Sequence, residues 1–142
     1  MNSPILAPAV ALVLWTLLVL AGLALTRLPA MRKAGIDLGA LVGNRGSALE
    51  GVIPDRVNWI AHNYEHLVEQ PTLFYAIVCI LALQGGGDGT NLALAWAYVI
   101  LRVAHTIVQT TRNRVSVRFA VFSAGTAVLI ALAVNAARAA RW

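Results

Sequence analysis

Two histidines and a glutamate stand within one helical turn in the stretch His62–His66, which reads HNYEH. The pattern H-x-x-E-H occurs in a class of zinc peptidases, where both histidines bind the metal. A zinc site needs a third protein ligand, and after Glu69 the chain offers only Asp88 and His105. The motif alone is therefore weak. It favours a histidine pair that is hydrogen-bonded at the wet end of a helix, and no metal is expected.

Arg102 is a second residue with chemical potential, because it stands near the middle of the apolar stretch 91–111. A charge at the centre of a membrane helix costs about 2.5–3.5 kcal/mol, so it is either paired or functional. Glu65 and Glu69, on an earlier helix, are the available partners. Two interpretations stay open: an interhelical ion pair that fixes packing, and a cavity for an anionic ligand in which the carboxylates orient the cationic groups.

The composition places most of the chain in lipid. Of its 142 residues, 59% are hydrophobic and 12% are charged, whereas about a quarter of an ordinary soluble domain is charged. The net charge of +5 comes from basic residues that flank apolar runs, which is typical of membrane proteins and not of nucleic-acid binding. The lone Cys79 lies in an apolar run and is interpreted as a small hydrophobic residue.

The apolar runs predict an all-α membrane protein, a four-transmembrane-helix bundle in one domain over 1–142. The first run carries no preceding positive charge and is interpreted as a retained helix, not a signal peptide. A long loop with prolines and glycines follows it, with one short interfacial helix expected around Leu38–Val42. The expected spans are residues 5–26, 56–84, 91–111 and 118–137, and the long cytoplasmic loop is 27–55.

Polar residues recur at helical spacing on two of these helices. On the second helix the spacing predicts one polar face opposite an apolar one, with a possible kink at Pro71. The third helix carries a similar stripe, with His105 alongside it. Such stripes are typical of helices that line a polar cavity. The residues of the first stripe are Asn58, His62, Glu65 and Glu69, and those of the second are Tyr98, Arg102, Thr106 and Gln109.

The basic residues predict the orientation of the chain. The first and third loops carry eight of them, and with four spans these two loops share one side, expected to be cytoplasmic. The other side has only Arg138 and Arg141, so both termini are expected outside the cytoplasm. The eight are Arg27, Arg32, Lys33, Arg45, Arg56, Arg112, Arg114 and Arg118.

The stretch LRVAHTIVQTTRNRVSVR, residues 101–118, resembles the third-helix signature of the MAPEG family, the membrane-associated proteins in eicosanoid and glutathione metabolism. The stretch NYEHLVEQPTLFYA, residues 63–76, is similar to the second-helix motif of the family in its uncharacterised bacterial members. The likeness covers roughly 55–137. It implies a homotrimer in a bacterial inner membrane, with glutathione as co-substrate bound between subunits and a lipophilic small molecule as the other substrate.

The resemblance also implies roles for single residues. Arg118 corresponds to the arginine that faces the glutathione thiol and is the expected catalytic residue. Arg102 and His105 fall in the glutathione-site helix, and either Glu65 or Glu69 takes the role of the family glutamate. The expected glutathione-binding residues are Asn63, Glu65, Glu69, Arg102, His105, Gln109 and Arg114.

These residue types suit glutathione, which carries two carboxylates and one ammonium. Arginine binds carboxylates through two parallel hydrogen bonds, and a glutamate can hold the ammonium. The expected activity is therefore a glutathione-dependent transferase or peroxidase. The alternative is a non-catalytic lipid-binding or scaffold member, because Gln109 stands where a tyrosine is common and Phe119 where a serine is.

Overall fold

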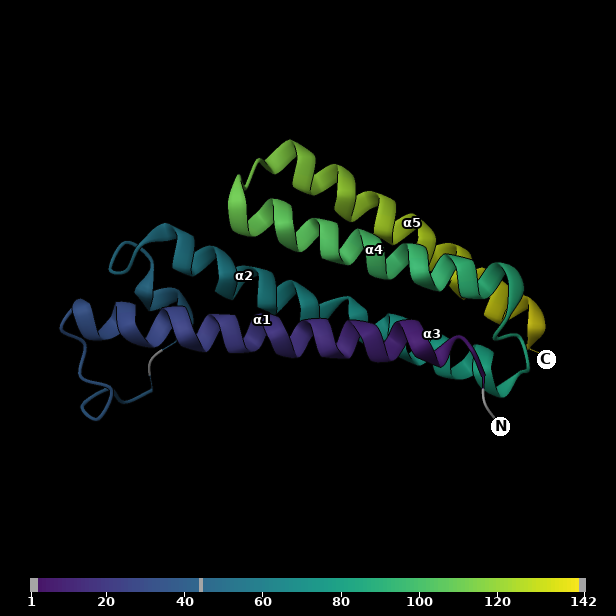
Figure 1. Ribbon diagram of the computed structural model, residues 1–142, viewed down its shortest axis with the longest axis horizontal. Helices are drawn as coiled ribbons and strands as arrows, with labels where there is room; N and C mark the ends of the chain where they lie inside the picture. Colours follow the sequence, from purple (N-terminus) through teal and green to yellow (C-terminus); the bar gives the residue numbers. More distant parts are fainter. Residues whose placement is uncertain (1–2, 44, 141–142) are drawn as a thin grey trace.

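The computed structural model describes residues 3–43 and 45–140, and all regular structure in these residues is helical. Figure 1 shows the helices lying roughly along one long axis, with the loop between the first two helices at one end. The first helix begins and the last one ends at the other end (Figure 1). The elements are α1 (Leu6–Lys33), the 3-10 helix η1 (Gly46–Leu49), α2 (Asp55–Glu69), α3 (Pro71–Leu83), α4 (Gly89–Thr111) and α5 (Val115–Ala139).

Four segments are long and apolar enough to cross a membrane: α1, α2 together with α3, α4 and α5. No strand occurs in the described residues, so the predicted all-α fold with four spans is confirmed. The chain is an integral, multi-pass membrane protein. Arg141, which contributes to the expected orientation, lies outside the described residues.

α1 continues to Lys33, beyond the expected end of the first span at residue 26 and straight through Pro29. Proline removes one backbone donor from a helix, but the residues around it favour helix strongly enough to carry the chain onward. The helix ends at Gly35, which has a φ of 72°. The Ile36 N–H then donates to the Met31 carbonyl at 3.1 Å, a helix-ending bond that glycine makes possible.

The short helix expected at Leu38–Val42 is wrong. These residues form turns, because the Asp37 carboxylate accepts a hydrogen bond from the Gly39 N–H at 2.9 Å. Such local side-chain bonds compete with helix formation. The short helix of this loop is instead η1, four residues further along at Gly46–Leu49, and Leu49 is buried with Met31 and Ile53 in a small second core.

The second span is interrupted at Gln70, where Pro71 starts α3. Proline lacks an N–H and fits the first position of a helix, so the ladder of α2 ends one residue earlier. Gln70 keeps helical angles, with φ −65° and ψ −37°, and the two helices therefore follow one another closely. At this break the Gln70 side chain forms hydrogen bonds to Tyr98 of α4 and Thr126 of α5.

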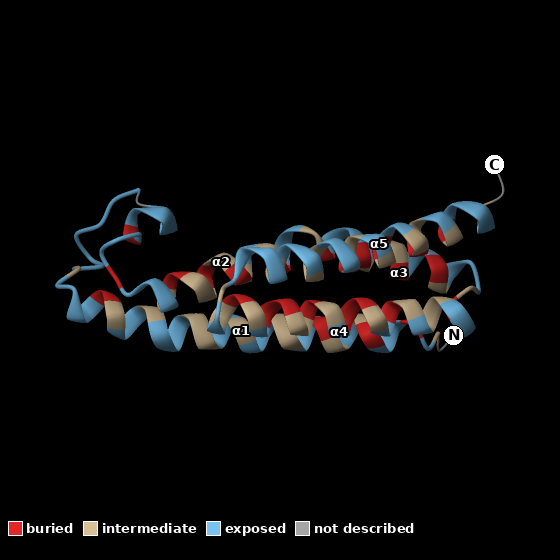
Figure 2. Cartoon of the chain, turned by 90° about the horizontal axis from the view of Figure 1, so that it is seen from above, coloured by how far each residue is buried: buried red, intermediate tan, exposed pale blue. Residues whose placement is uncertain are grey.

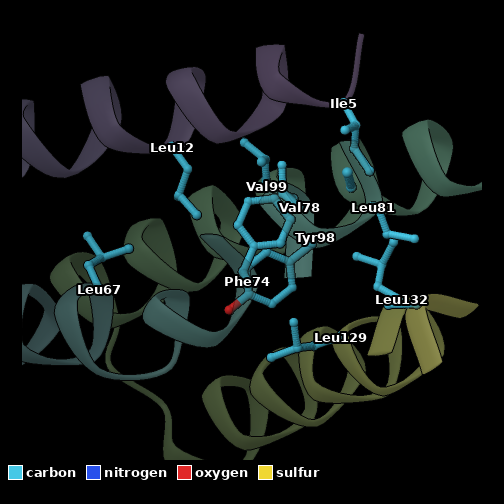
Figure 3. Close-up of a cluster of buried hydrophobic side chains, with 12 residues drawn as sticks. Ile5, Leu12, Leu67, Phe74, Val78, Leu81, Tyr98, Val99, Leu129 and Leu132 are labelled. Carbon is cyan, nitrogen blue, oxygen red and sulfur yellow. The ribbon is translucent and has the colours of Figure 1, made fainter. Parts of the chain in front are cut away.

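The main core lies among α1, α3, α4 and α5, with Leu67 contributed by α2, as Figure 3 shows. The rings of Phe74 and Tyr98 stack with their centroids 4.5 Å apart, and Leu12 and Leu129 approach them from the two outer helices. In Figure 2 the buried residues lie along the inward sides of the helices, while the loop end is largely exposed. This packing fixes α4 against α3, and it thereby sets the position of the polar residues that α4 carries.

Candidate functional site

A cavity of about 200 Å³ opens between α2, α4 and the first turns of α5. Histidines from two helices and an arginine from the third contribute its polar groups, and α5 contributes the apolar ones. A positive charge beside aromatic and apolar walls suits an anionic group attached to an apolar partner. The lining residues are His66, His105, Val115, Arg118, Phe119 and Phe122.

Arg118 is half-buried and is held by the turn that precedes its helix. Its Nη1 donates to Asn113 Oδ1 at 2.7 Å. Asn113 has a φ of 45°, in the left-handed region, and its N–H donates to the Val108 carbonyl at 2.8 Å. Asparagine tolerates this backbone conformation better than most residues. The tight connection between α4 and α5 thus aims the guanidinium toward the cavity and restrains it there.

His105 meets His66 across the α2–α4 interface, with ring centroids 5.7 Å apart and the rings at 90°. His105 is buried with 3% of its surface exposed, and its ring also lies 6.4 Å from that of Phe122. His66 lines the cavity, although the resemblance did not assign it to the glutathione site. Its spacing of four from His62 placed both in one motif, yet the two side chains contact different neighbours.

His62 contacts Glu50 of the loop, with Nε2 and Oε1 3.2 Å apart, whereas His66 faces His105 and also lies 3.6 Å from Glu69. The two histidines of the H-x-x-E-H pattern therefore do not converge on one point. Within residues 3–43 and 45–140, no group of three or more histidine, cysteine, aspartate or glutamate side chains is placed to hold a metal ion.

Arg102 lies in the interior of the bundle with 3% of its surface exposed. Its Nε donates to the Tyr98 hydroxyl at 3.0 Å, and its guanidinium carbon lies 5.2 Å from the Tyr98 ring centre and 5.6 Å from that of Phe122. Its Nη2 has no hydrogen-bond partner among the described residues. A buried charged donor of this kind is costly unless a further molecule completes its bonds.

Of the two interpretations left open for Arg102, the ion pair with a carboxylate of the second span is not formed among the described residues of the protomer. Glu65 and Glu69 are both exposed on α2, and in the described part of the chain the ion-pair contacts are those of His62 and His66. The structure divides the predicted stripe: Asn58 is buried, His62 is half-buried, and Glu65 and Glu69 are exposed. The residues of α2 that face the bundle interior are Asn58, Ala61, Asn63 and Leu67.

Gln70, which was not predicted as functional from the sequence, is hydrogen-bonded to two neighbouring helices. Its Oε1 accepts a hydrogen bond from the Tyr98 hydroxyl at 3.3 Å, and its Nε2 donates to Thr126 Oγ1 at 2.9 Å. These bonds connect the α2–α3 break with α4 and α5, and through Tyr98 they reach Arg102. The spacing of four from His66 to Gln70 could have indicated that both share a face.

Tyr98→Phe is expected to destabilise the protein by about 1–3 kcal/mol, because Arg102 Nε and Gln70 Oε1 then lose a partner inside the bundle. Equilibrium unfolding in mixed detergent measures the change. Tyr64→Phe is the matched control, since the Tyr64 hydroxyl bonds to none of the described residues and its loss should change stability much less. Equal losses of unfolding free energy in the two variants would show that the hydrogen bonds of Tyr98 do not contribute to stability.

Asn63 and Gln109 lie one helical turn from the His66–His105 contact, on the same side of it. Both are buried, with 0% and 1% of their surface exposed. Both polar atoms of the Asn63 side chain and Oε1 of Gln109 lack a partner within the described residues. Buried polar groups in proteins are nearly always hydrogen-bonded, so this pair marks a second place that can receive a polar ligand.

The remaining residues expected at the site lie on the outside of the protomer. Arg114 is exposed and occupies the position immediately before α5. The structure thus brings together Arg118, His105 and His66, and it places Arg102 over the ring of Phe122, which also lines the cavity. Glu65, Glu69 and Arg114 are exposed.

Comparison with protein families gives one match: the model described as "MAPEG family" matches residues 5–138, nearly the whole chain. No curated protein and no solved structure matches. The family match includes every residue of the candidate site.

Proposed function

This chain belongs to the MAPEG family, and from that premise we propose that it is a membrane enzyme that activates glutathione toward lipophilic substrates. The family is associated with glutathione in general, which supports the class of co-substrate. The proposed activity is glutathione transfer to an electrophile or reduction of an organic peroxide. The observation that carries the proposal is the cavity that Arg118 and His105 line together.

Arg118 is the proposed catalytic residue, because its charge favours the reactive form of the thiol. A free cysteine-type thiol has a pKa of about 8.5 and is mostly protonated at neutral pH. An opposite charge within about 4–6 Å stabilises the thiolate. In the transfer reaction the sulfur forms a bond to the electrophilic carbon, the leaving group departs with its bonding electrons, and the thiol proton passes to solvent.

The rest of glutathione is proposed to bind along α2 and α4. Arg102 has a free donor, and Arg114 is accessible at the start of α5, so each can bind a carboxylate. Asn63 and Gln109 offer the unpartnered amide groups that a peptide backbone requires. Glutathione carries carboxylates that the two arginines can bind and peptide groups that Asn63 and Gln109 can bind.

The glutamates of α2 support a homotrimer in which neighbouring protomers share each site. Glu69 lies about 21 Å along the helix axis from Leu83, the end of the span. This depth falls within the roughly 30 Å of hydrocarbon, where an exposed charge costs several kcal/mol. We infer that a neighbouring protomer covers this face, and that Glu65 or Glu69 binds the glutathione ammonium there.

A lipophilic substrate is proposed to reach the site from the bilayer. Val115 and Phe119 line the cavity and are 67% and 68% exposed, so its wall continues onto the lipid-facing surface. The distribution of basic residues supports an orientation with both termini outside the cytoplasm. The proposed location, a bacterial inner membrane, rests on the resemblance to bacterial members of the family. The sulfur and the substrate then meet near the cytoplasmic boundary of the hydrocarbon.

Calorimetric titration of the detergent-purified protein with glutathione tests the proposal. We expect saturable binding at millimolar or lower concentration, and weaker binding for a glutathione analogue that lacks the glycine carboxylate. Absence of binding at millimolar glutathione would favour the non-catalytic lipid-binding or scaffold alternative, which Gln109 and Phe119 also favour.

Asn113→Gly is expected to lower turnover about fivefold while leaving stability nearly unchanged. Glycine adopts the positive φ of Asn113 easily, so the turn persists, but Arg118 loses the amide that restrains it. Asn113 is thus a positioning residue. Steady-state kinetics should show the change mainly in kcat. Asn113→Asp keeps the acceptor oxygen but adds a negative charge beside Arg118, so it should lower kcat further than Asn113→Gly does. An unchanged kcat in both variants would contradict this role.

A further inference from the structure

A second cavity, of about 400 Å³, lies at the loop end of the protomer, between the last turns of α1 and the loop that follows. Its lining combines two arginines with four apolar side chains and contains no acidic residue. A cavity with this composition suits a molecule that joins an anionic group to apolar chains. The charged pair is Arg27 and Arg45, and the apolar residues are Met31, Leu38, Leu41 and Leu49.

Arg27 is fixed across this cavity by the backbone of η1. Its Nη2 donates to the Gly46 carbonyl at 2.8 Å. A Cβ at Gly46 would lie only 3.0 Å from the same nitrogen, so glycine is what permits this close approach. The guanidinium is therefore positioned by the fold, and one bond to a neutral carbonyl leaves its charge uncompensated.

The acidic side chains of the loop are engaged elsewhere. Asp37 accepts the Gly39 N–H, and Glu50 contacts His62. No ion pair joins Arg27 or Arg45 to an acidic residue anywhere in the described part of the protein. Two unneutralised cations thus remain beside the cavity.

The position of Arg27 in the span matches the level of lipid headgroups. It lies 21 residues after Leu6, the start of α1, which corresponds to about 32 Å of helix. The hydrocarbon core is about 30 Å thick, so Arg27 emerges at the boundary with the headgroups. Leu38, Leu41 and Val42 are 47%, 40% and 95% exposed, which is typical of a loop that rests on the membrane surface.

We propose that this cavity binds the headgroup region of an anionic phospholipid. Its phosphate contacts Arg27 and Arg45, its glycerol backbone lies against the apolar lining residues, and its acyl chains extend back along α1 into the hydrocarbon. The site is separate from the cavity at Arg118 and does not depend on glutathione chemistry. Basic pockets at the ends of membrane helices are known to attract anionic headgroups.

The test uses the full-length protein in nanodiscs and in mild detergent. Native mass spectrometry after extraction from phosphatidylcholine nanodiscs that contain 30% phosphatidylglycerol is expected to detect retained phosphatidylglycerol. Arg27→Gln/Arg45→Gln should bind this lipid about tenfold more weakly. Arg32→Gln/Lys33→Gln removes the same charge from the adjacent turn of α1, outside the cavity, and should retain the wild-type affinity.

Three results would overturn the proposal. Equal retention of phosphatidylcholine would show that the headgroup charge is not recognised. Equal losses in the two double variants would show a general surface effect. Thermal stabilisation by inorganic phosphate to the same degree as by phosphatidylglycerol would show that the site takes a free anion. If Arg27→Gln/Arg45→Gln does not fold, the single variant Arg45→Gln replaces it in the comparison with Arg32→Gln/Lys33→Gln. The Arg45 side chain makes no hydrogen bond to the described residues, so its loss should not affect folding.

Discussion

Substituting Arg118 by alanine is expected to abolish most of the thiolate absorbance that glutathione develops when it binds this protein. If the guanidinium lowers the thiol pKa by two units, about three quarters of the bound thiol is ionised at pH 7, and without it about three per cent. Turnover should then fall about twenty-five-fold. Ultraviolet difference spectroscopy with saturating glutathione measures the first effect, and steady-state kinetics measures the second.

Two further variants make this result specific. Arg112→Ala removes an exposed arginine from the same connection between α4 and α5 and should leave the absorbance band intact. Arg118→Lys keeps a positive charge but loses the rigid fork that Asn113 restrains, so an intermediate band is expected. An unchanged band in Arg118→Ala would remove Arg118 from the mechanism.

Arg102→Met is expected to weaken glutathione binding about a hundredfold while the protein becomes as stable as before or more so. The guanidinium is buried with an unpartnered Nη2, a condition that costs free energy in the absence of ligand. Methionine fills similar space without a charge, and the Tyr98 hydroxyl keeps its bond to Gln70. Calorimetry measures the affinity, and thermal unfolding in detergent measures the stability.

The opposite directions of the two effects separate a ligand-binding role from a structural one. If Arg102 served packing alone, its loss would lower the melting temperature and leave glutathione binding intact in the protein that remains folded. A parallel loss of both properties would point to misfolding. The conservative Arg102→Lys should recover part of the affinity, since the charge returns without the second donor.

The sequence predicts much of this architecture because apolar length is a direct physical requirement of the bilayer. It also indicates Arg102, since a charge inside an apolar run demands an explanation. α1 runs seven residues past the expected end of its membrane span, because Pro29 does not end the helix and the chain turns only at Gly35, which has a positive φ. A single proline removes one bond, but a glycine with positive φ redirects the chain.

The orientation of α2 could not be predicted from spacing. A period of 3.6 residues shows that Asn58, Glu65 and Glu69 are close to one another around the helix, but not whether that face meets its own bundle, lipid or another protomer. Asn63 is fully buried, whereas both glutamates are exposed. The packing of α2 against α4 determines which face of α2 is buried, and the sequence of α2 alone does not contain that information. His66 and Gln70 were missed for the same reason, because their partners come from distant helices.

The start of α5 has a consequence for the chemistry beside Arg118. No side chain caps this helix, so the backbone N–H groups of its first turn remain available near Val115, which lines the cavity. The peptide dipoles of a helix add up to roughly half a positive charge at its N-terminus, and this charge also favours a thiolate. Any bound thiolate in Arg118→Ala beyond the roughly three per cent expected of a free thiol would therefore report the contribution of the peptide backbone, which no side-chain substitution removes.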